Sequence, residues 1–227
     1  MFNNEMVGAI IVAAGNSTRM DGIDKMFAPL GGKPILARVV SVFETTPSVD
    51  RIVVVLNAHN LERGRQLALV ECWQKTDAFI SGGILRQDSV RAGLAKLSNC
   101  KWIIVHDGAR PLVTKDLIEA GLKAAEETGG AIAAVSVVDT IKEENGGFIA
   151  RTPPRGILRA AQTPQIFRAD IINDAYEHAA IEVTDDASLV EASGHRIRLY
   201  PGDYQNLKIT SPDDLIYADI LWRRREC

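Results

Sequence analysis

A short loop after an apolar run carries the first residues of the sequence that suit chemistry. The stretch "IIVAAGNSTRM" contains Ala13, Ala14 and Gly15, whose small size lets a ligand approach backbone amides. Arg19 and Lys25 follow and offer, respectively, a planar fork and a compact point charge for phosphate oxygens. The loop therefore suits a phosphate-bearing anion.

The common phosphate-loop patterns do not describe this loop. It lacks the Gly-Lys-Ser/Thr ending of a Walker A motif and the three glycines of G-x-G-x-x-G, and the later "GGKP" has Pro34 where a metal-binding hydroxyl is needed. An ordinary strand-end turn with two solvated cations explains the spacing equally well. On spacing alone, both interpretations stay open.

A carboxylate follows a second apolar run, in "WIIVHDGARP". Asp107 comes just after a predicted buried strand, where it can reach a divalent cation, and Mg²⁺ needs only one or two carboxylates besides phosphate oxygens. Gly108 and Arg110 follow Asp107 and are expected to line the opening of the same site. Taken alone, "HDGAR" favours an aspartate that caps a turn. His106 is predicted to pack at the strand end rather than to act as a ligand.

Two further motifs supply polar groups. In "SGGILRQDSV", Gly82 and Gly83 permit close backbone approach, and Ser89 lies at a helix start, where Asp88 and Ser89 are also suited to capping. In "NLKITSPDD", Lys208 precedes a helix start at Ser211. The acids that follow complement the helix dipole, so they are assigned no metal.

The elements around these motifs alternate between short apolar runs and amphipathic stretches. We expect strands at Val7–Val12, Ile52–Leu56, Ala78–Ile80, Trp102–Val105 and Ala131–Val135, and helices at about 34–45, 61–74, 87–97 and 114–128. Strands that are apolar throughout are covered on both faces, so this pattern predicts an α/β fold, a mostly parallel sheet wrapped by helices. Such sheets bind ligands at the carboxyl ends of their strands. One domain over residues 1–227 is expected.

A segment at about 137–160 breaks this alternation. Asn145-Gly146-Gly147 between β-branched pieces predicts a hairpin, and three prolines rule out a helix further along. We therefore expect a β-arm that projects from the sheet and is flanked by return loops up to Gln165. Its apolar residues Ile141, Phe148 and Ile149 lack a local core, which favours a homodimer in which a second subunit covers them.

Six motifs in order resemble one known family. "VAAGNSTRM" with "DKMFAPLGGKPIL" resembles the first loop of sugar-nucleotide pyrophosphorylases and related nucleotidyltransferases, whose fold is Rossmann-like. "RQDSVRAGL", "VHDGARP", "TPQIF", "TDDASLVE" and "NLKITSPDDL" narrow the resemblance to 2-C-methyl-D-erythritol 4-phosphate cytidylyltransferases of non-mevalonate isoprenoid synthesis. The resemblance covers nearly the whole chain. It implies that CMP passes from CTP to the polyol phosphate and that pyrophosphate is released.

The same resemblance assigns roles to residues. It implies that Arg19 and Lys25 stabilise the transition state at the α-phosphate and that Asp107 binds Mg²⁺ or another divalent cation. Groups from Ala13, Ala14, Gly15, Gly82, Gly83 and Ser89 bind CTP. The resemblance also implies that Arg110, Thr184 and Lys208 hold the polyol phosphate, together with Thr140 and Arg155 from the neighbouring subunit. It counts Lys208 and Arg155 among the catalytic residues, with Arg19 and Lys25.

One position departs from the family pattern. The residue before the loop lysine is usually proline, whereas this chain has Asp24 before Lys25. An extra carboxylate there is expected either to pair with the lysine or to face solvent. Its effect on the geometry of the loop is open.

Composition limits the possible classes of protein. The 227 residues are 46% hydrophobic and carry a net charge of −3, so a dedicated nucleic-acid binder is disfavoured. No apolar run is long enough for a membrane span, no basic segment at the N-terminus indicates a signal peptide, and the three cysteines form no C-x-x-C pair. A cytoplasmic location is expected.

Two alternatives to the implied activity remain. A cytidylyltransferase for another polyol phosphate, such as ribitol 5-phosphate, shares most of these motifs. A nucleotide-binding regulatory module without turnover is disfavoured, because Arg19, Lys25, Asp107 and Lys208 are all retained.

Overall fold

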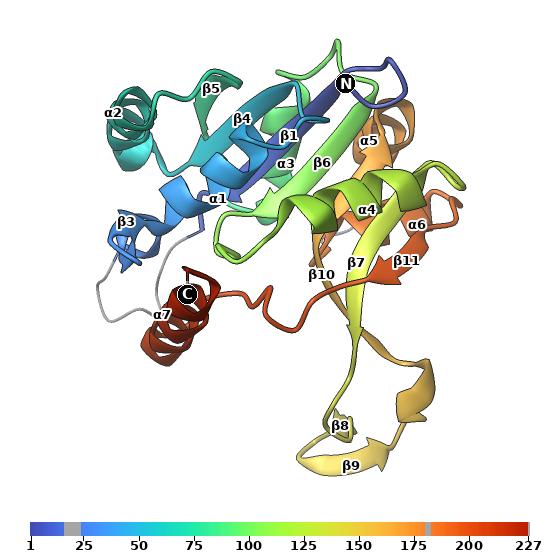
Figure 1. The fold of residues 1–227 in the computed structure, drawn as a ribbon. Helices are drawn as coiled ribbons and strands as arrows, with labels where there is room; N and C mark the ends of the chain where they lie inside the picture. Colours follow the sequence, from blue (N-terminus) through green and yellow to red (C-terminus); the bar gives the residue numbers. More distant parts are fainter. Residues whose placement is uncertain (16–23, 180–182, 227) are drawn as a thin grey trace.

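A seven-stranded sheet forms the centre of the protein, as seen in the computed structural model, which describes residues 1–15, 24–179 and 183–226 (Figure 1). The strand order is β11-β7-β10-β6-β1-β4-β5. Only β10 runs antiparallel to its neighbours β6 and β7. The expected mostly parallel sheet is therefore confirmed. Its strands are β1 (Val7–Ala13), β4 (Arg51–Leu56), β5 (Thr76–Ser81), β6 (Trp102–Asp107), β7 (Gly130–Ser136), β10 (Arg159–Arg168) and β11 (Arg198–Pro201).

Helices cover both faces of this sheet. Their bounds are α1 (Ile35–Glu44), α2 (Leu61–Glu71), α3 (Arg86–Leu94), α4 (Lys115–Ala125), α5 (Ala169–Glu177), α6 (Asp186–Ala192) and α7 (Pro212–Glu226). Apolar residues of α1, α4 and α7 pack in one core cluster, and those of α3, α5 and α6 pack in another. Among the residues described here, no helix is long and apolar enough to cross a membrane.

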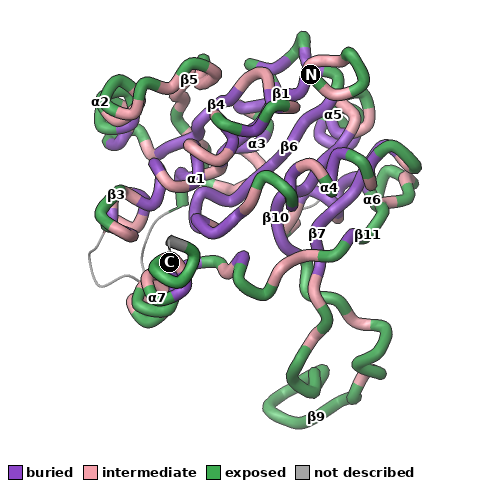
Figure 2. Tube along the Cα trace, in the orientation of Figure 1, coloured by how far each residue is buried: buried purple, intermediate pink, exposed green. Residues whose placement is uncertain are grey.

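The central strands are buried because their apolar side chains alternate between these two clusters. Along β1, Ile11 faces the cluster that contains α1, whereas Ile10 faces the cluster that contains α3. Figure 2 shows the resulting band of buried residues through the middle of the sheet. Helix α3 packs especially close, because a Cβ added at Gly93 would lie only 2.7 Å from Ile10 Cγ2. The packing of the central strands therefore fixes the positions of the loops that follow their carboxyl ends.

The segment before Gln165 corrects one expectation. The predicted return loops at residues 161–165 belong instead to strand β10, which pairs with β6 and β7. The three prolines excluded a helix but not a strand. The register of the β10–β7 pairing shifts between Ala161 and Gln165. The pairing therefore skips Pro164, which has no backbone N–H to donate a hydrogen bond.

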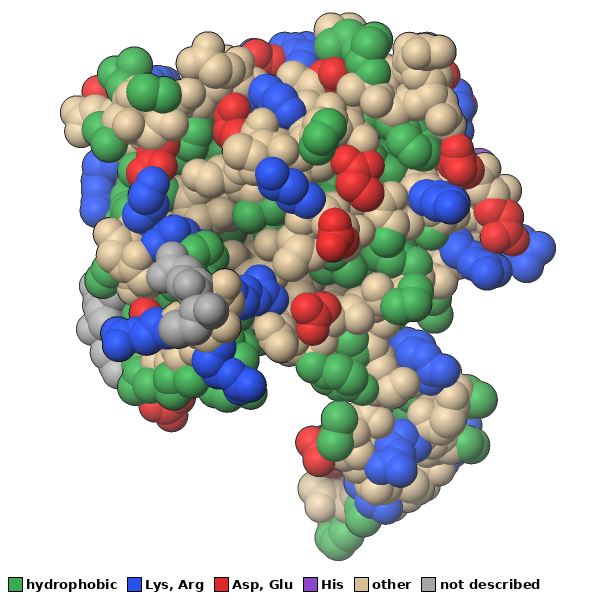
Figure 3. Space-filling view, viewed as in Figure 1, with side chains coloured by type: hydrophobic (Ala, Val, Ile, Leu, Met, Phe, Trp, Pro, Cys, Tyr) green, Lys and Arg blue, Asp and Glu red, His purple; other side chains and the backbone are tan. Residues whose placement is uncertain are grey.

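The predicted hairpin is present and lies apart from the sheet. Strands β8 (Glu143–Asn145) and β9 (Phe148–Arg151) pair with each other, and Gly146 and Gly147 supply the positive φ angles of the turn, 60° and 84°. Figure 3 shows hydrophobic and basic side chains together on this projection. Phe148 and Ile149 are exposed. Residues 137–158, called the arm below, thus leave the sheet after β7 and return at β10.

Short elements complete the chain. They are β2 (Pro29–Leu30), β3 (Lys33–Pro34) and the single-turn helices η1 (Lys25–Phe27), η2 (Ala58–Asn60) and η3 (Arg155–Ile157). The predicted helix start at Ser211 is confirmed, because Ser211 Oγ accepts from the backbone N–H of Asp214 at 3.3 Å. Strand β11 and helix α5 were not predicted from the sequence.

Candidate active site

A cavity of about 630 Å³ opens at the carboxyl ends of β1, β4, β5 and β6. Strand β1 lies between β4 and β6 in the sheet, so the cavity occupies the position where open α/β sheets bind ligands. It brings together nine residues predicted from the sequence, which are Ala13, Ala14, Gly15, Lys25, Gly82, Gly83, Ser89, Asp107 and Lys208. Arg19 was also predicted here and lies outside the described residues.

One wall of the cavity is formed by small residues in close contact. A Cβ at Gly82 would lie 2.4 Å from Ala14 Cβ and 2.5 Å from Ser89 Oγ, so glycine is required for this packing. Helix α3 is capped by Asp88, whose Oδ2 accepts from the backbone N–H of Leu85 at 3.0 Å. Of the two predicted capping residues, Asp88 therefore caps the helix, and Ser89 lines the cavity.

Asp24 anchors the turn that carries Lys25. Its carboxylate accepts from the backbone N–H of Met26 at 3.2 Å and from Asn60 Nδ2 at 2.8 Å, and it forms an ion pair with Arg63 at 3.2 Å. The Arg63 guanidinium also lies 3.8 Å from the centre of the Phe27 ring. The residue that departs from the family pattern thus ties η1 to the start of α2. From the sequence, Asp24 was expected either to pair with Lys25 or to face solvent, and this anchoring role was not predicted.

Asp107, the last residue of β6, is surrounded by cations. Lys208 Nζ lies 2.8 Å and Arg110 Nε 3.8 Å from its Oδ2, and Arg86 Nε lies 3.4 Å from its Oδ1. Burial alone would raise the pKa of Asp107, but the positive charges of Arg86, Lys208 and Arg110 outweigh it and hold the pKa well below its usual range. The carboxylate is therefore ionised at neutral pH.

This carboxylate suits a divalent cation that arrives with a nucleotide. Within the described parts of the chain, no three His, Cys, Asp or Glu side chains cluster as a metal site. A single carboxylate nonetheless fits Mg²⁺ when phosphate oxygens and waters complete its octahedral shell. The Lys208 side chain is 43% exposed, so it can move away from Asp107 Oδ2 and leave that oxygen to the cation.

His106 is a packed residue, as predicted. It is fully buried, its Nδ1 lies 3.0 Å from Thr163 Oγ1, and its Nε2 lies 3.2 Å from the carbonyl oxygen of Arg110. Thr163 Oγ1 also accepts from the backbone N–H of Asp107 at 3.0 Å. Burial lowers the pKa of His106 to about 4, so the ring is neutral at neutral pH. Its contacts with Thr163 and Arg110 fix the carboxyl end of β6.

The segment between β11 and α7 delivers Lys208 to this point. The backbone N–H of Ile209 donates to the carbonyl oxygen of Ala109 at 2.8 Å, and Arg110 Nη1 donates to the carbonyl oxygen of Asn206 at 2.7 Å. Arg110 therefore joins the C-terminal segment to the loop after β6. This contact brings two predicted substrate-binding residues, Arg110 and Lys208, to the same carboxylate oxygen of Asp107, Oδ2.

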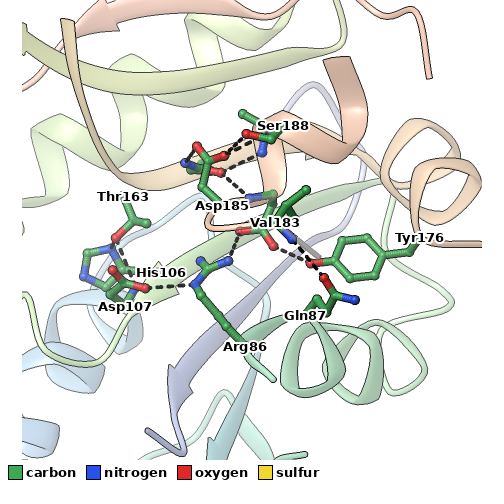
Figure 4. Close-up of polar contacts among 12 residues, drawn as sticks. Arg86, Gln87, His106, Asp107, Thr163, Tyr176, Val183, Asp185 and Ser188 are labelled. Atoms are coloured by element: carbon green, nitrogen blue, oxygen red, sulfur yellow. Dashed lines mark hydrogen bonds and ion pairs between the residues drawn. The ribbon is translucent and has the colours of Figure 1, made fainter. Parts of the chain in front are cut away.

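Arg86 and its partners were not singled out from the sequence. Arg86 lines the cavity and lies between Asp107 and Tyr176 (Figure 4). Its Nη1 forms an ion pair with Asp186 Oδ2 at 2.8 Å, and Tyr176 donates to Asp186 Oδ1 at 2.5 Å. Asp186 was predicted only as a first-turn acid of a helix. The sequence did hold a signal for Arg86. It comes just before the helix predicted at 87–97 and shortly after Gly82 and Gly83.

Four predicted substrate residues are not among those that line this cavity, although one of them, Arg110, contacts the lining residue Asp107. Thr184 is exposed one residue before the N-cap of α6, Asp185. Thr140 is exposed on the arm. Arg155 donates from Nη1 to the carbonyl oxygen of Val138 at 2.7 Å and lines a separate cavity of about 490 Å³ at the base of the arm.

Comparisons with known proteins agree over nearly the whole chain. Residues 7–224 match the sequence model of a family described as "IspD: 2-C-methyl-D-erythritol 4-phosphate cytidylyltransferase". The chain is 52% identical over 225 residues to the 2-C-methyl-D-erythritol 4-phosphate cytidylyltransferase of Dehalococcoides mccartyi, with 99% of both chains covered.

Solved structures give the same result. The structure of 4-diphosphocytidyl-2C-methyl-D-erythritol synthase from Anaerococcus prevotii matches with a TM-score of 0.85 at 25% identity, over 96% of each chain. The structure of 2-C-methyl-D-erythritol 4-phosphate cytidylyltransferase from Thermus thermophilus matches with a TM-score of 0.79 at 31% identity, over 94% of this chain and 98% of the other.

Proposed function

The chain belongs to the IspD family of 2-C-methyl-D-erythritol 4-phosphate cytidylyltransferases, and we propose that it transfers CMP from CTP to 2-C-methyl-D-erythritol 4-phosphate. The products are 4-diphosphocytidyl-2-C-methyl-D-erythritol and pyrophosphate. The observation that carries the proposal is that a wall of small residues, Lys25, Asp107 and Lys208 all line the same cavity.

The reaction requires positioning and positive charge rather than a base. An ionised phosphate oxygen of the polyol phosphate forms a bond to the α-phosphorus, and the bond from that phosphorus to pyrophosphate breaks. No proton leaves the attacking oxygen, so no side chain has to accept one. Fixed cations stabilise the charge that gathers on the phosphate oxygens as the bond forms.

The nucleotide occupies the half of the cavity nearest β1 and β5. Backbone groups at Ala13–Gly15 and at Gly82 and Gly83, with the hydroxyl of Ser89, hold the cytidine, because the absence of bulky side chains lets a base approach the chain. Lys25, held by the Asp24 anchor, and Arg19 stabilise the α-phosphate. Asp107 would hold the divalent cation together with phosphate oxygens of CTP, and the cation would supply positive charge that stabilises the departing pyrophosphate.

The second substrate binds on the side of Lys208. Lys208 and Arg110 present positive charge there. Thr184, one residue before the N-cap of α6, is proposed to contact the same substrate. Arg155 and Thr140 lie on the arm, away from the cavity of their own chain, so they contribute to a site only when a second copy supplies them. Exposed Phe148 and Ile149 on the same arm favour such a homodimer.

The test is an assay of pyrophosphate release with purified protein, CTP and Mg²⁺. We expect rapid release with 2-C-methyl-D-erythritol 4-phosphate and at least about 100-fold lower kcat/KM with ribitol 5-phosphate, since a polar site discriminates by its hydrogen bonds. A preference for ribitol 5-phosphate would reassign the substrate. CTP binding without turnover on either polyol phosphate would indicate a nucleotide-binding module.

A further inference from the structure

Arg86 contacts two carboxylates unequally. Its Nη1 lies 2.8 Å from Asp186 Oδ2, whereas its Nε lies 3.4 Å from Asp107 Oδ1. Figure 4 shows the guanidinium with dashed contacts on two sides, one of them to Asp107. The shorter contact is therefore with the carboxylate farther from the cavity.

Asp186 is placed where it cannot contact a substrate. It is fully buried, it accepts a hydrogen bond from Tyr176, and its backbone N–H donates to Gln165 Oε1 at 3.1 Å. Gln165 Oε1 also accepts from the backbone N–H of Ala187 at 3.0 Å, which fixes the first turn of α6 against β10. Any effect of Asp186 on the site must therefore pass through Arg86.

Two of the three cations around Asp107 differ in how firmly they are held. Lys208 is half exposed and can move to a phosphate, whereas Arg86 is held by the buried Asp186. Arg86 remains beside Asp107 when Lys208 leaves, so its charge always opposes a metal cation bound there. Because Asp186 neutralises and draws back this guanidinium, it reduces that opposition.

Resting on the proposed function, we infer that Asp186 is a positioning residue that holds Arg86 partly away from Asp107 and so keeps Asp107 available to the divalent cation that accompanies the nucleotide. Tyr176 supports it by fixing the second carboxylate oxygen. A buried ion pair that only stabilises the fold is the alternative, and the two differ in the sign of their effects on metal binding.

The experiment measures Mn²⁺ binding in the presence of CTP and in the absence of the polyol phosphate, by the electron paramagnetic resonance signal of free Mn²⁺. Asp186→Asn leaves Arg86 without its counter-charge, so the Mn²⁺ dissociation constant should rise about tenfold. Arg86→Gln removes the opposing charge, so the constant should fall, by up to about tenfold. The double variant should resemble Arg86→Gln, because Asp186 acts only through the arginine.

A matched control uses the ion pair of Arg51 with Asp77, at the amino ends of β4 and β5 and thus at the opposite edge of the sheet. Asp77→Asn makes the same chemical change and should leave Mn²⁺ binding unaltered. Circular dichroism and thermal unfolding establish that each variant is folded at the temperature of measurement.

The inference is overturned if both single variants shift the Mn²⁺ constant in the same direction, or if only their unfolding temperatures change. Should Arg86→Gln fail to fold with Asp186 left unpaired, the double variant decides, since it must bind Mn²⁺ more tightly than Asp186→Asn does. The measurement needs no turnover. A protein that shows these opposite shifts but releases no pyrophosphate would contradict the proposed function and leave this inference standing.

Discussion

Lys208 Nζ lies 2.8 Å from Asp107 Oδ2, although the two residues come from the C-terminal segment and from the middle of the sheet. The contact joins an exposed cation and a buried anion, both of which line one cavity. In the proposed reaction the two separate, since Asp107 turns to the cation of the nucleotide and Lys208 to the phosphate of the second substrate. This separation gives the first prediction.

Lys208→Ala should affect the two substrates differently. We expect kcat/KM for 2-C-methyl-D-erythritol 4-phosphate to fall about 100-fold, because a charged contact to the reacting phosphate is lost. CTP binding in the presence of a divalent cation should not weaken, since the competitor for Asp107 has been removed. Steady-state kinetics with each substrate varied, and calorimetry with CTP, measure the two effects. Weaker CTP binding and unchanged kinetics with the polyol phosphate would contradict the assignment. Lys96→Ala, at an exposed position after α3, is the control.

Lys25→Ala should act mainly on turnover. The charge of Lys25 is expected to matter most as negative charge gathers around the α-phosphorus, so kcat should fall by roughly 10²–10³ while KM for CTP changes little. Lys33→Ala changes a lysine of strand β3 that pairs with Glu71 and should keep the parental rate. Near-normal turnover of Lys25→Ala would remove this lysine from the reaction.

Asp107→Asn should raise the concentration of Mg²⁺ needed for half-maximal activity. The amide keeps the shape of the side chain, but it loses the charge that a hard cation requires. The parent should lose activity with a chelator and recover it when Mg²⁺ is added back. An enzyme that is insensitive to the chelator, or a variant with the parental Mg²⁺ dependence, would exclude Asp107 as the metal ligand.

His106 gives a pH dependence of stability. Burial lowers its pKa to about 4 in the folded protein from 6.5 in an exposed histidine, so protonation favours the unfolded chain. The contribution of neutral His106 is complete above pH 6.5 and is lost as the pH falls toward 4, at up to about 1.4 kcal/mol per pH unit. Between pH 7 and 5 the free energy of unfolding should therefore fall by about 2 kcal/mol from this group.

Urea unfolding of the parent and of His106→Gln at several pH values in this range measures the effect. The variant should be less stable at pH 7, because the ring contacts with Phe43 and Thr163 are lost, but its stability should depend less on pH. Equal slopes for the parent and His106→Gln would refute the assignment.

The sequence predicted the parts of this protein whose patterns are local. Strands such as β1 and β6 are continuous apolar runs, so their existence and their buried position followed directly, and small or charged residues just after them predicted the cavity. Strand β10 was missed because Pro164 interrupts its pattern, and only pairing with β6 and β7 explains it. Asp186 was missed for a different reason. An acid in the first turn of a helix is fully explained by the dipole, and only the tertiary structure brings it opposite Arg86.

The position of the arm predicts complementation between two inactive variants. Lys25 lines the cavity of its own chain, whereas Arg155 lies at the base of the arm and is proposed to serve the site of a partner. Lys25→Ala and Arg155→Ala should therefore each be nearly inactive as homodimers. In a mixed dimer, the chain with Arg155→Ala retains its own Lys25 and receives Arg155 from the chain with Lys25→Ala. One complete site results, and the other site lacks both groups.

Co-refolding the two variants in equal amounts tests this arrangement through recovery of pyrophosphate release. Random pairing puts half of the dimers in the mixed form, each with one complete site, so about a quarter of the parental activity is expected from the symmetry of a two-fold dimer. Differently tagged chains allow the mixed dimers to be isolated, which should raise this to about half. As a control, co-refolding Lys25→Ala with Asp107→Ala should restore nothing, because both residues line the same cavity of one chain. Isolated mixed dimers of Lys25→Ala and Arg155→Ala without activity would mean that Arg155 does not act across the interface, and the arm would then serve only to join the subunits.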